Sequence, residues 1–361
     1  MFKRTFTKRF SRIARYAIAA TFAFSALTVP LSAQSADFVL KYGHPGPVGP
    51  DSDDDVAGQF LKFFLEARSN GRIEVQIFPG SQLGNFREMV EQVNANTLEV
   101  AHSALGGLVG FMPELQVIEL PYVIRDDAVA ECMVNGPFFD DARAQFLEKS
   151  GNVNLIGIGN TGRFRNFFTK DALVKQASDL EGVKMRVINS QLPVEMMKFF
   201  GANPTPVAWG ELYTSLATGV VEGTKNAVTD IIPNKMNEVV KFATVDEHAY
   251  LYGFMAVSQS FLDSMPDDLR ALTISGIKQM ADVQMQFNKG AEARQSAAFL
   301  ESGGEIYVPT EEDMKTFRAV KEPMREWYVD QFGNEWYDKY TNAATACEEQ
   351  VDARIGALGG G

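Results

Sequence analysis

The sequence predicts an α/β fold of two lobes, joined by crossing strands and by a long helix that spans both. Three observations support this prediction. With 361 residues, 45% of them hydrophobic, the chain is long enough to bury two cores. Strand patterns alternate with helix patterns, and no low-complexity linker separates the halves. One helix pattern, over 266–302, would form a rod of roughly 54 Å, which is longer than a single lobe needs.

The first 36 residues have the pattern of a secretory signal peptide. They contain six basic residues and no acid, then an apolar run over 17–29 that is too short to span a bilayer, then small residues over 31–36. We therefore expect export to the periplasm and a mature protein that is not embedded in the membrane. The net charge of the whole chain is −12, so no nucleic-acid partner is expected.

The first lobe is expected to alternate between strands and helices, as in a largely parallel sheet. The strands are expected at 38–42, 72–78 and 98–101, and the helices at 51–67 and 85–95.

Two features of these helices can be read from the sequence. Asn85, with Glu88 three residues later, resembles a capping box. In the helix over 51–67, Phe60, Phe63 and Phe64 are expected on one face. The acidic run at 53–55 suits the first turn, where the helix dipole favours negative charge.

The remaining elements follow the same rules. Strands are expected at 154–159, from 163 onward, at 220–225, 254–258 and 305–308, and helices at 191–200, 209–218, 266–302, 310–331 and 334–355. These elements assign 37–161 plus 252–291 to lobe I and 162–251 plus 292–358 to lobe II, with a disordered tail at 359–361.

Two further patterns have limited meaning. Cys132 and Cys347 are the only cysteines, and they could form one disulfide in an oxidising periplasm or stay as two buried thiols. Gly157, Gly159 and Gly162 have the spacing of a dinucleotide fingerprint. A strand pattern follows them where the fingerprint requires a helix, so we interpret them as a crossing between lobes.

Arg165 and Arg186 each lie in a short apolar segment with a strand pattern. A guanidinium among apolar neighbours is costly unless an anion meets it. An internal Asp or Glu could be that anion, because acids outnumber bases in this chain. A bound carboxylate is the alternative, because the planar fork of arginine makes two parallel hydrogen bonds to it.

The sequence around these arginines resembles that of the solute-binding proteins of TRAP transporters, the DctP-type periplasmic receptors. The resemblance covers nearly the whole mature chain and rests on the segments at 81–84, 120–123, 162–169, 179–187, 202–213 and 216–226. It implies a two-lobed receptor that captures a small organic anion, closes its lobes over it and delivers it to the membrane permease subunits.

The resemblance also implies roles for single residues. Arg186 matches the family's carboxylate clamp, and Arg165 matches a second arginine that contacts the ligand. Trp209 matches an aromatic ring that lies against the ligand. Asn226 is the last residue of a segment that resembles the family, and its side-chain amide can donate hydrogen bonds to the ligand and accept them from it. The two arginines are expected to lie unpartnered between the lobes, whereas Arg163 is expected at the rim or in a salt bridge.

The first lobe should supply the opposite wall. His44 and Ser103 each end a strand, where open α/β sheets bind ligands, and Tyr250 could reach the same cleft. Lys225 departs from the family, which usually has Gln or Glu there. It either faces solvent or adds a cation to the pocket.

No catalytic or metal-binding spacing is present, and three histidines are too scattered for a metal pair. We therefore expect no metal, no cofactor and no enzymatic activity, and we expect a monomer. The alternatives are an ABC-type binding protein, a secreted α/β enzyme acting on a small carboxylic acid, and a sensory receptor that uses the same pocket.

Overall fold

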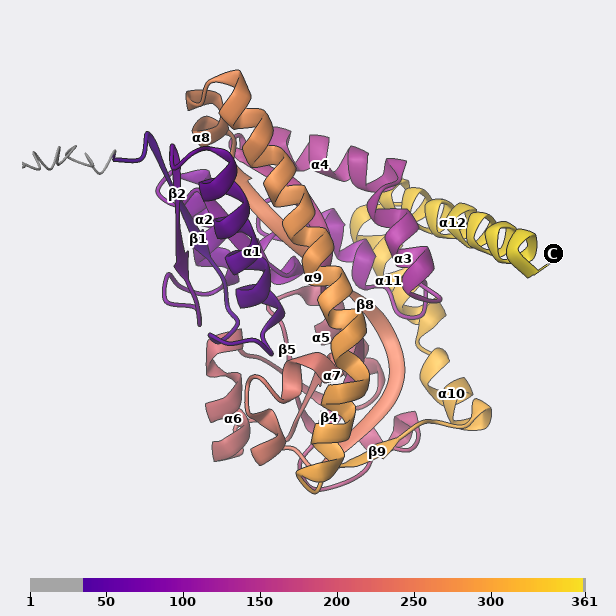
Figure 1. Ribbon diagram of the computed structural model, residues 1–361. Coiled ribbons are helices and arrows are strands. Elements are labelled where there is room, and N and C mark those ends of the chain that lie inside the picture. The colour runs from indigo at the N-terminus through magenta and orange to yellow at the C-terminus, as the bar shows by residue number, and fades with distance from the viewer. Residues whose placement is uncertain (1–34, 360–361) are drawn as a thin grey trace, which may run out of the picture. The chain divides into compact units, whose positions relative to one another are not determined.

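One mixed sheet runs through the described part of the chain, which is residues 35–359 of a computed structural model (Figure 1). Its order is β2-β1-β3-β8-β4-β7-β5-β6, and β9 pairs with β8. The strands are β1 (Phe38–Gly43), β2 (Ile73–Phe78), β3 (Val100–Ser103), β4 (Val153–Thr169), β5 (Lys184–Val187), β6 (Asn203–Pro206), β7 (Gly223–Asn226), β8 (Phe242–Ser258) and β9 (Glu305–Tyr307).

The helices cover this sheet. They are α1 (Asp53–Arg68), α2 (Phe86–Asn94), α3 (Asp127–Val134), α4 (Pro137–Ser150), α5 (Gln191–Phe199), α6 (Leu212–Thr218), α7 (Val228–Ile231), α8 (Gln259–Ser264), α9 (Asp267–Glu301), α10 (Glu311–Arg318), α11 (Lys321–Phe332) and α12 (Glu335–Gly359). Short 3₁₀ turns lie at Leu105–Gly107, Pro113–Glu119, Ala177–Leu180, Trp209–Glu211 and Met236–Glu238.

Two long antiparallel strands, β4 and β8, join the two halves of the sheet. The end of β8 pairs with β3, and the end of β4 pairs with β7. The strands expected at 154–159 and from 163 onward are therefore one strand, and the strand expected at 254–258 is the end of β8. The β4–β8 register shifts between Asn160 and Arg163, where Arg163 takes a φ of 77°. The first-lobe strands β2, β1 and β3 are parallel, as expected, and the sheet as a whole is mixed because β8 and β4 run antiparallel to each other, to β3 and to β7.

Helix α9 packs against both halves of the fold, as the sequence predicted. Its first half contributes Leu269, Ile277 and Met280 to a core with α1, β1 and β2. Its end contributes Phe299 to a second core with α6 and α7. Figure 1 shows α9 as a continuous rod across the described unit. The described residues from Ala36 onward form one compact unit by their contacts, and the lobe boundaries stay a prediction.

The glycine pattern at 157–162 has a packing reason. A Cβ at Gly157 would lie 2.9 Å from the carbonyl oxygen of Ile277, and one at Gly159 would lie 2.8 Å from that of Ala281. The two glycines thus let α9 approach β4 closely. No helix opens after Gly162, because β4 continues to Thr169.

Replacing Gly159 by alanine should therefore destabilise the protein by about 1–3 kcal/mol, because the new methyl group meets the backbone of α9. Urea unfolding measures the change. Gly290→Ala is the control. Gly290 lies in α9, a Cβ at this position would meet nothing within 4 Å, and alanine favours a helix. Equal effects of the two substitutions would refute the close-packing explanation.

Several local expectations are corrected. Phe63 is 75% exposed, so it does not share the buried face of Phe64. The helix expected over 310–331 is two helices, α10 and α11, which separate at Ala319 and Val320. Helices α3 and α4 were not predicted. The Asn85–Glu88 capping box is confirmed.

The terminal predictions fall mostly on residues that the structure does not describe. The signal peptide (1–36) is one of these, and of the predicted tail only Gly359 is described, as the last residue of α12. Cys132 of α3 and Cys347 of α12 form a disulfide, with their Cα atoms 5.7 Å apart. It ties the C-terminal helix to the first half of the chain.

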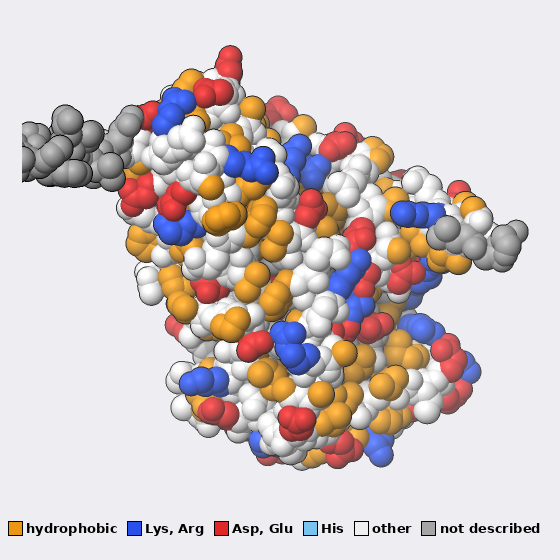
Figure 2. Space-filling view, in the orientation of Figure 1, with side chains coloured by type: hydrophobic (Ala, Val, Ile, Leu, Met, Phe, Trp, Pro, Cys, Tyr) orange, Lys and Arg blue, Asp and Glu red, His pale blue; other side chains and the backbone are white. Residues whose placement is uncertain are grey.

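On the face that Figure 2 shows, acidic and basic side chains are interspersed. Within residues 35–359, no helix combines the length and the apolarity needed to cross a bilayer.

Candidate functional site

A cavity lies where the two halves of the sheet meet. It holds about 510 Å³ of space outside protein atoms, counted to its mouth. Its lining includes four of the predicted residues, namely Arg165, Arg186, Trp209 and Asn226. We call it the central cavity.

The topology explains why these residues meet. Arg165, Asn226 and Arg186 lie on three adjacent strands, in the order β4-β7-β5. Arg186 lies opposite Thr224 in the β5–β7 pair, and Asn226 lies opposite Asn166, next to Arg165, in the β4–β7 pair. Trp209 begins the 3₁₀ turn that follows β6. A side chain from each of these neighbouring segments therefore reaches one space.

Arg186 is buried but has no anionic partner among the described residues. It is 1% exposed, its Nε donates to the carbonyl oxygen of Val207 at 3.0 Å, and its guanidinium lies 5.8 Å from the ring centre of Trp209. Burial, followed by repulsion from Arg165, lowers its pKa to about 9. Its two terminal nitrogens donate to no described acceptor, so they are available to an anion in the cavity.

Arg165 corrects the expectation of two unpartnered arginines. Its Nη2 donates to Oε1 of Glu119 at 3.0 Å, and its Nη1 donates to the carbonyl oxygen of Lys225 at 3.1 Å. Both charged side chains are buried. Glu119 offsets the second positive charge, so the cavity has one uncompensated arginine rather than two. The signal for Glu119 was an acid inside an otherwise apolar stretch, 115–124.

Asn226 is engaged within the protein. Its Oδ1 accepts from Oγ1 of Thr224 at 2.6 Å, and its Nδ2 donates to Oδ2 of Asp230 at 2.9 Å. The amide lines the cavity, yet its clearest effect is to hold Asp230 in place.

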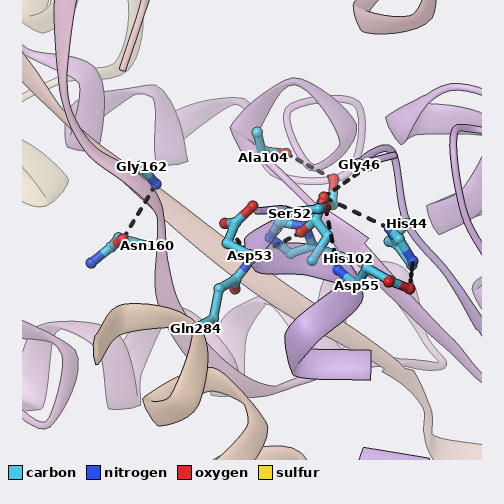
Figure 3. A network of polar contacts seen from close by, with 12 residues as sticks. His44, Gly46, Ser52, Asp53, Asp55, His102, Ala104, Asn160, Gly162 and Gln284 are labelled. Carbon is cyan, nitrogen blue, oxygen red and sulfur yellow. Dashed lines mark hydrogen bonds and ion pairs between the residues drawn. The ribbon is translucent and has the colours of Figure 1, made fainter. Parts of the chain in front are cut away.

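Three predicted residues are buried outside the lining. Ser103 donates to the adjacent carbonyl oxygen of Ala104. Tyr250 accepts from Nδ2 of Asn160 at 2.8 Å. His44 stacks on Tyr42, and Figure 3 shows it beside Asp55 at the start of α1. The structure therefore does not bring His44, Ser103 or Tyr250 to the cavity surface.

His44 and His102 both contact Asp54, a residue of the cavity lining. Nδ1 of His44 lies 3.9 Å from Oδ2 of Asp54, and Nδ1 of His102 lies 2.5 Å from Oδ1 of Asp54. The carboxylate of Asp54 raises the pKa of His102 against the effect of burial, and His102 lowers the pKa of Asp54. These two groups form a buried ion pair whose carboxylate reaches the cavity.

The sequence interpretation missed the acidic part of the lining, Asp53 and Asp230. Burial and the charge of Asp54 raise the pKa of Asp53 to about 7, and burial raises the pKa of Asp230 to about 6. The signal for Asp53 was the acidic run at 53–55, which was interpreted only as a helix N-terminus.

Two cations beside the cavity have structural roles. Arg163 pairs with Asp127 and Glu292, which confirms the salt-bridge alternative. Lys225 is 2% exposed, so it does not face solvent, and it does not line the central cavity either. Burial, followed by repulsion from Arg165, lowers the pKa of Lys225 to about 7.

Burial of Lys225 predicts a pH-dependent cost in stability. The unfolded chain keeps this lysine protonated up to its usual pKa of 10.5, whereas the folded chain releases the proton near pH 7. The cost is therefore complete below about pH 7 and shrinks as the pH rises towards 10.5. Lys225→Met should raise the free energy of unfolding by about 2–4 kcal/mol at pH 6 and by less at pH 9.5.

Urea unfolding at the two pH values measures this difference, with Lys184→Met as the control. Lys184 is half exposed and pairs with Glu222 at the surface, so its replacement should change stability by less than about 1 kcal/mol. A gain from Lys225→Met that is equal at pH 6 and pH 9.5 would contradict the shifted pKa.

Among residues 35–359, no group of three or more His, Cys, Asp or Glu side chains is arranged to hold a metal ion. The arrangement that is present, a buried arginine whose terminal nitrogens can donate to an anion in the cavity, suits the binding of a small carboxylate.

Comparisons with known proteins agree with this chemistry. Residues 52–331 match the family model described as bacterial extracellular solute-binding protein, family 7. The 2,3-diketo-L-gulonate-binding periplasmic protein YiaO of Escherichia coli is 27% identical over 86% of this chain and 92% of its own. The C4-dicarboxylate-binding periplasmic protein DctP of Rhodobacter capsulatus is 27% identical over 90% of this chain and 96% of its own.

The fold also matches solved structures. The sugar acid binding protein DctPAm of Advenella mimigardefordensis, solved in complex with galactonate, superposes with a TM-score of 0.81 at 21% identity. The match covers 86% of this chain and 98% of that one. The two-lobed α/β fold predicted from the sequence is thus confirmed.

Proposed function

The chain belongs to the bacterial extracellular solute-binding proteins of family 7, and we propose that its central cavity captures a small organic acid for the membrane subunits of a TRAP transporter. One observation supports this assignment above the others: Arg186 is buried in the cavity wall, and its terminal nitrogens meet no described acceptor. Leaving such a charge unsatisfied costs free energy that a ligand carboxylate recovers.

The binding mode follows from this geometry. The carboxylate accepts two parallel hydrogen bonds from Arg186, whose plane is held by Val207 and Trp209. Arg165 contributes through its Nε, which has no acceptor among the described residues, while Glu119 balances its charge. In this closed space each charge-assisted bond is stronger than it would be in water.

Ligand entry requires the two halves to separate. Arg165, Arg186 and Asn226 are each at most 2% exposed, so a ligand cannot reach them without movement. The register shifts of β4 and β8 around Asn160–Arg163 are suited to a hinge, because the regular ladder is interrupted there. We propose that ligand binding shifts this opening equilibrium towards the closed form.

The remaining parts of the proposal concern partners and place. Members of this family are periplasmic and are substrate-binding proteins rather than enzymes. For this chain we propose export by the signal peptide at 1–36, action as a monomer, and binding without turnover. The acceptor of the loaded protein would be the TRAP permease subunits.

A thermal-shift screen against small organic acids tests the function. A ligand that binds only the folded protein, at about a hundred times its Kd, should raise Tm by several degrees. The panel should hold monocarboxylates, dicarboxylates, keto acids, sugar acids, amino acids and sulfonates, and the products should be checked for turnover. Failure of every acid to raise Tm would contradict the assignment, and conversion of an acid would favour the enzyme alternative.

A further inference from the structure

The central cavity has two sides of opposite charge. Arg165 and Arg186 form what we call the arginine side, and Asp53 and Asp230 form the acidic side. Asp230, on α7, is near enough to Arg186 to affect its pKa. Asp230 is hydrogen-bonded to Asn226 of β7, the strand between those of the two arginines, whereas Asp53 is hydrogen-bonded to Gln284 and Asn288 of α9.

Each carboxylate on the acidic side is held through one oxygen and has the other available. Oδ2 of Asp53 accepts from Nε2 of Gln284 at 2.9 Å and from Nδ2 of Asn288 at 3.0 Å, both on α9. Figure 3 shows Gln284 beside Asp53. Oδ1 of Asp53 accepts from no donor within the described residues.

Asp230 has the same arrangement. Its Oδ2 accepts from Nδ2 of Asn226 at 2.9 Å and from the backbone amide of Ala227 at 3.1 Å. For its Oδ1 the described chain supplies no donor. Two fixed carboxylates thus each retain one oxygen with unused acceptor capacity, on elements from the two halves of the fold, α1 and α7.

Asp54, which also lines the cavity, differs from these two. Its Oδ1 accepts from Gln284 and is paired with His102, and its Oδ2 accepts from the backbone amide of Gly46 at 2.9 Å. Its charge and its acceptor capacity are already satisfied, so Asp53 and Asp230 are the groups that remain for a ligand. Burial is the first cause of the raised pKa values of both carboxylates, and neither forms an ion pair among the described residues.

We propose that the ligand is a monocarboxylate whose other end carries hydrogen-bond donors, either hydroxyl groups or an ammonium group, and that dicarboxylates are rejected. Arg186 holds the carboxylate, and the free oxygens of Asp53 and Asp230 accept from the donors. This inference rests on the function proposed above. Above about pH 7, where Asp53 and Asp230 are both ionised, a second carboxylate on the ligand could donate nothing and would face two like charges, and an apolar end would leave both acceptors unpaired.

Calorimetric titration with acids of matched length tests the inference. The four-carbon set is butyrate, succinate, 4-aminobutyrate, erythronate and threonate. The six-carbon set is hexanoate, adipate, 6-aminohexanoate, gluconate and galactonate. The set whose length fits the cavity is the one that decides. Within it, at least one acid that carries hydroxyl or ammonium groups should bind at least about tenfold more tightly than the apolar acid and the dicarboxylate.

The outcomes separate the inference from the function. If succinate or adipate binds most tightly, the inference is overturned while the organic-acid receptor stands. The same holds if the apolar acids match the donor-bearing ones. If no acid of either set binds, and the wider thermal-shift panel is also negative, the proposed function falls and the inference falls with it.

Paired variants test the two carboxylates directly. Asp53→Asn with Asp230→Asn removes both charges at constant shape. It should weaken the preferred acid at least about tenfold and should strengthen binding of the dicarboxylate of the same length. Asp51→Asn is the control, because Asp51 is exposed and pairs with Arg294 outside the cavity. Unchanged selectivity in the double variant, with its apo melting temperature preserved, would overturn the role of the acidic side.

The pH dependence of binding distinguishes the two kinds of donor. An ammonium ligand needs ionised carboxylates, so its affinity should fall as the pH is lowered from 8 to 5.5, through the pKa values of Asp53 and Asp230. A hydroxyl ligand should change less, because a protonated carboxyl group still has acceptor capacity. An affinity that rises for both ligands on acidification would contradict the use of these carboxylates as acceptors.

Discussion

Arg186→Ala is expected to lower the affinity for the bound organic acid by at least about 100-fold, which corresponds to about 3 kcal/mol. The lost interaction is a fork of two charge-assisted hydrogen bonds in a closed cavity, and no other described arginine in the lining lacks an ion-pair partner. Arg186→Lys should recover only part of the affinity. A lysine retains the charge but loses the fork of donors and the cation–π contact of the guanidinium with Trp209.

The same substitution should leave the unliganded protein at least as stable as before. Arg186 is a buried charge without an ion-pair partner among the described residues, so its removal takes away a desolvation cost. Calorimetry measures the affinity and urea unfolding measures the stability. Arg318→Ala is the control, because Arg318 pairs with Glu311 on the surface of α10. Unchanged affinity in Arg186→Ala would mean that the carboxylate binds elsewhere.

Glu119→Gln is expected to have the largest effect on stability, a loss of about 3 kcal/mol or more. The substitution keeps the shape of the side chain but leaves Arg165 buried without its counter-charge. Breaking a buried ion pair from one side is costly because the remaining charge stays desolvated. Lys225, already buried beside Arg165, would lose the same neighbouring carboxylate, and its pKa would fall further.

A bound anion should offset part of this loss. With Glu119 neutral, two arginines in the cavity lack a counter-charge, so the ligand-induced rise in Tm should be larger in Glu119→Gln than in the unaltered protein. Glu195→Gln is the matched control, because Glu195 pairs with Lys198 on the exposed face of α5. Its effect on unfolding should stay within about 1 kcal/mol. If both variants lost equally little stability, the Glu119–Arg165 pair would not balance the charge as described.

The sequence identified the arginine side of the cavity because its signals are local. Arg186 lies between Met185 and Val187 in the four-residue strand β5, and Trp209 was identified within the family-like segment at 202–213. Both residues can be recognised from the neighbouring sequence without knowledge of the fold. The long helix α9 was predictable for the same reason, since an unbroken pattern of that length depends only on the residues within it.

The acidic side could not be found in this way. An acidic residue in the first turn of a helix is favourable whether it faces solvent or a cavity, so the sequence alone could not show that Asp53 lines the site. The rotation of α1 is set by its packing against α9 and β2, and the same rotation exposes Phe63. Glu119 meets Arg165 across 46 positions of sequence, a distance that no local pattern encodes.

The predicted first-lobe contacts show the limit of a positional rule. His44 and Ser103 do lie at the ends of β1 and β3, as expected of ligand-binding residues in an open sheet. Tertiary packing then places Asp54 between the two histidines and the cavity. His44 therefore contacts Asp54, a residue of the lining, and does not line the cavity itself. The rule correctly identified the strand ends near which the cavity lies. Which side chains at these strand ends reach the cavity is decided by tertiary packing alone.

A crystal structure of the protein with its preferred organic acid tests the central claim most directly. The account predicts one carboxylate of the ligand within about 3 Å of both terminal nitrogens of Arg186, lying between the halves of the sheet. A ligand bound in the cavity with its carboxylate away from Arg186, or bound outside the central cavity altogether, would contradict it.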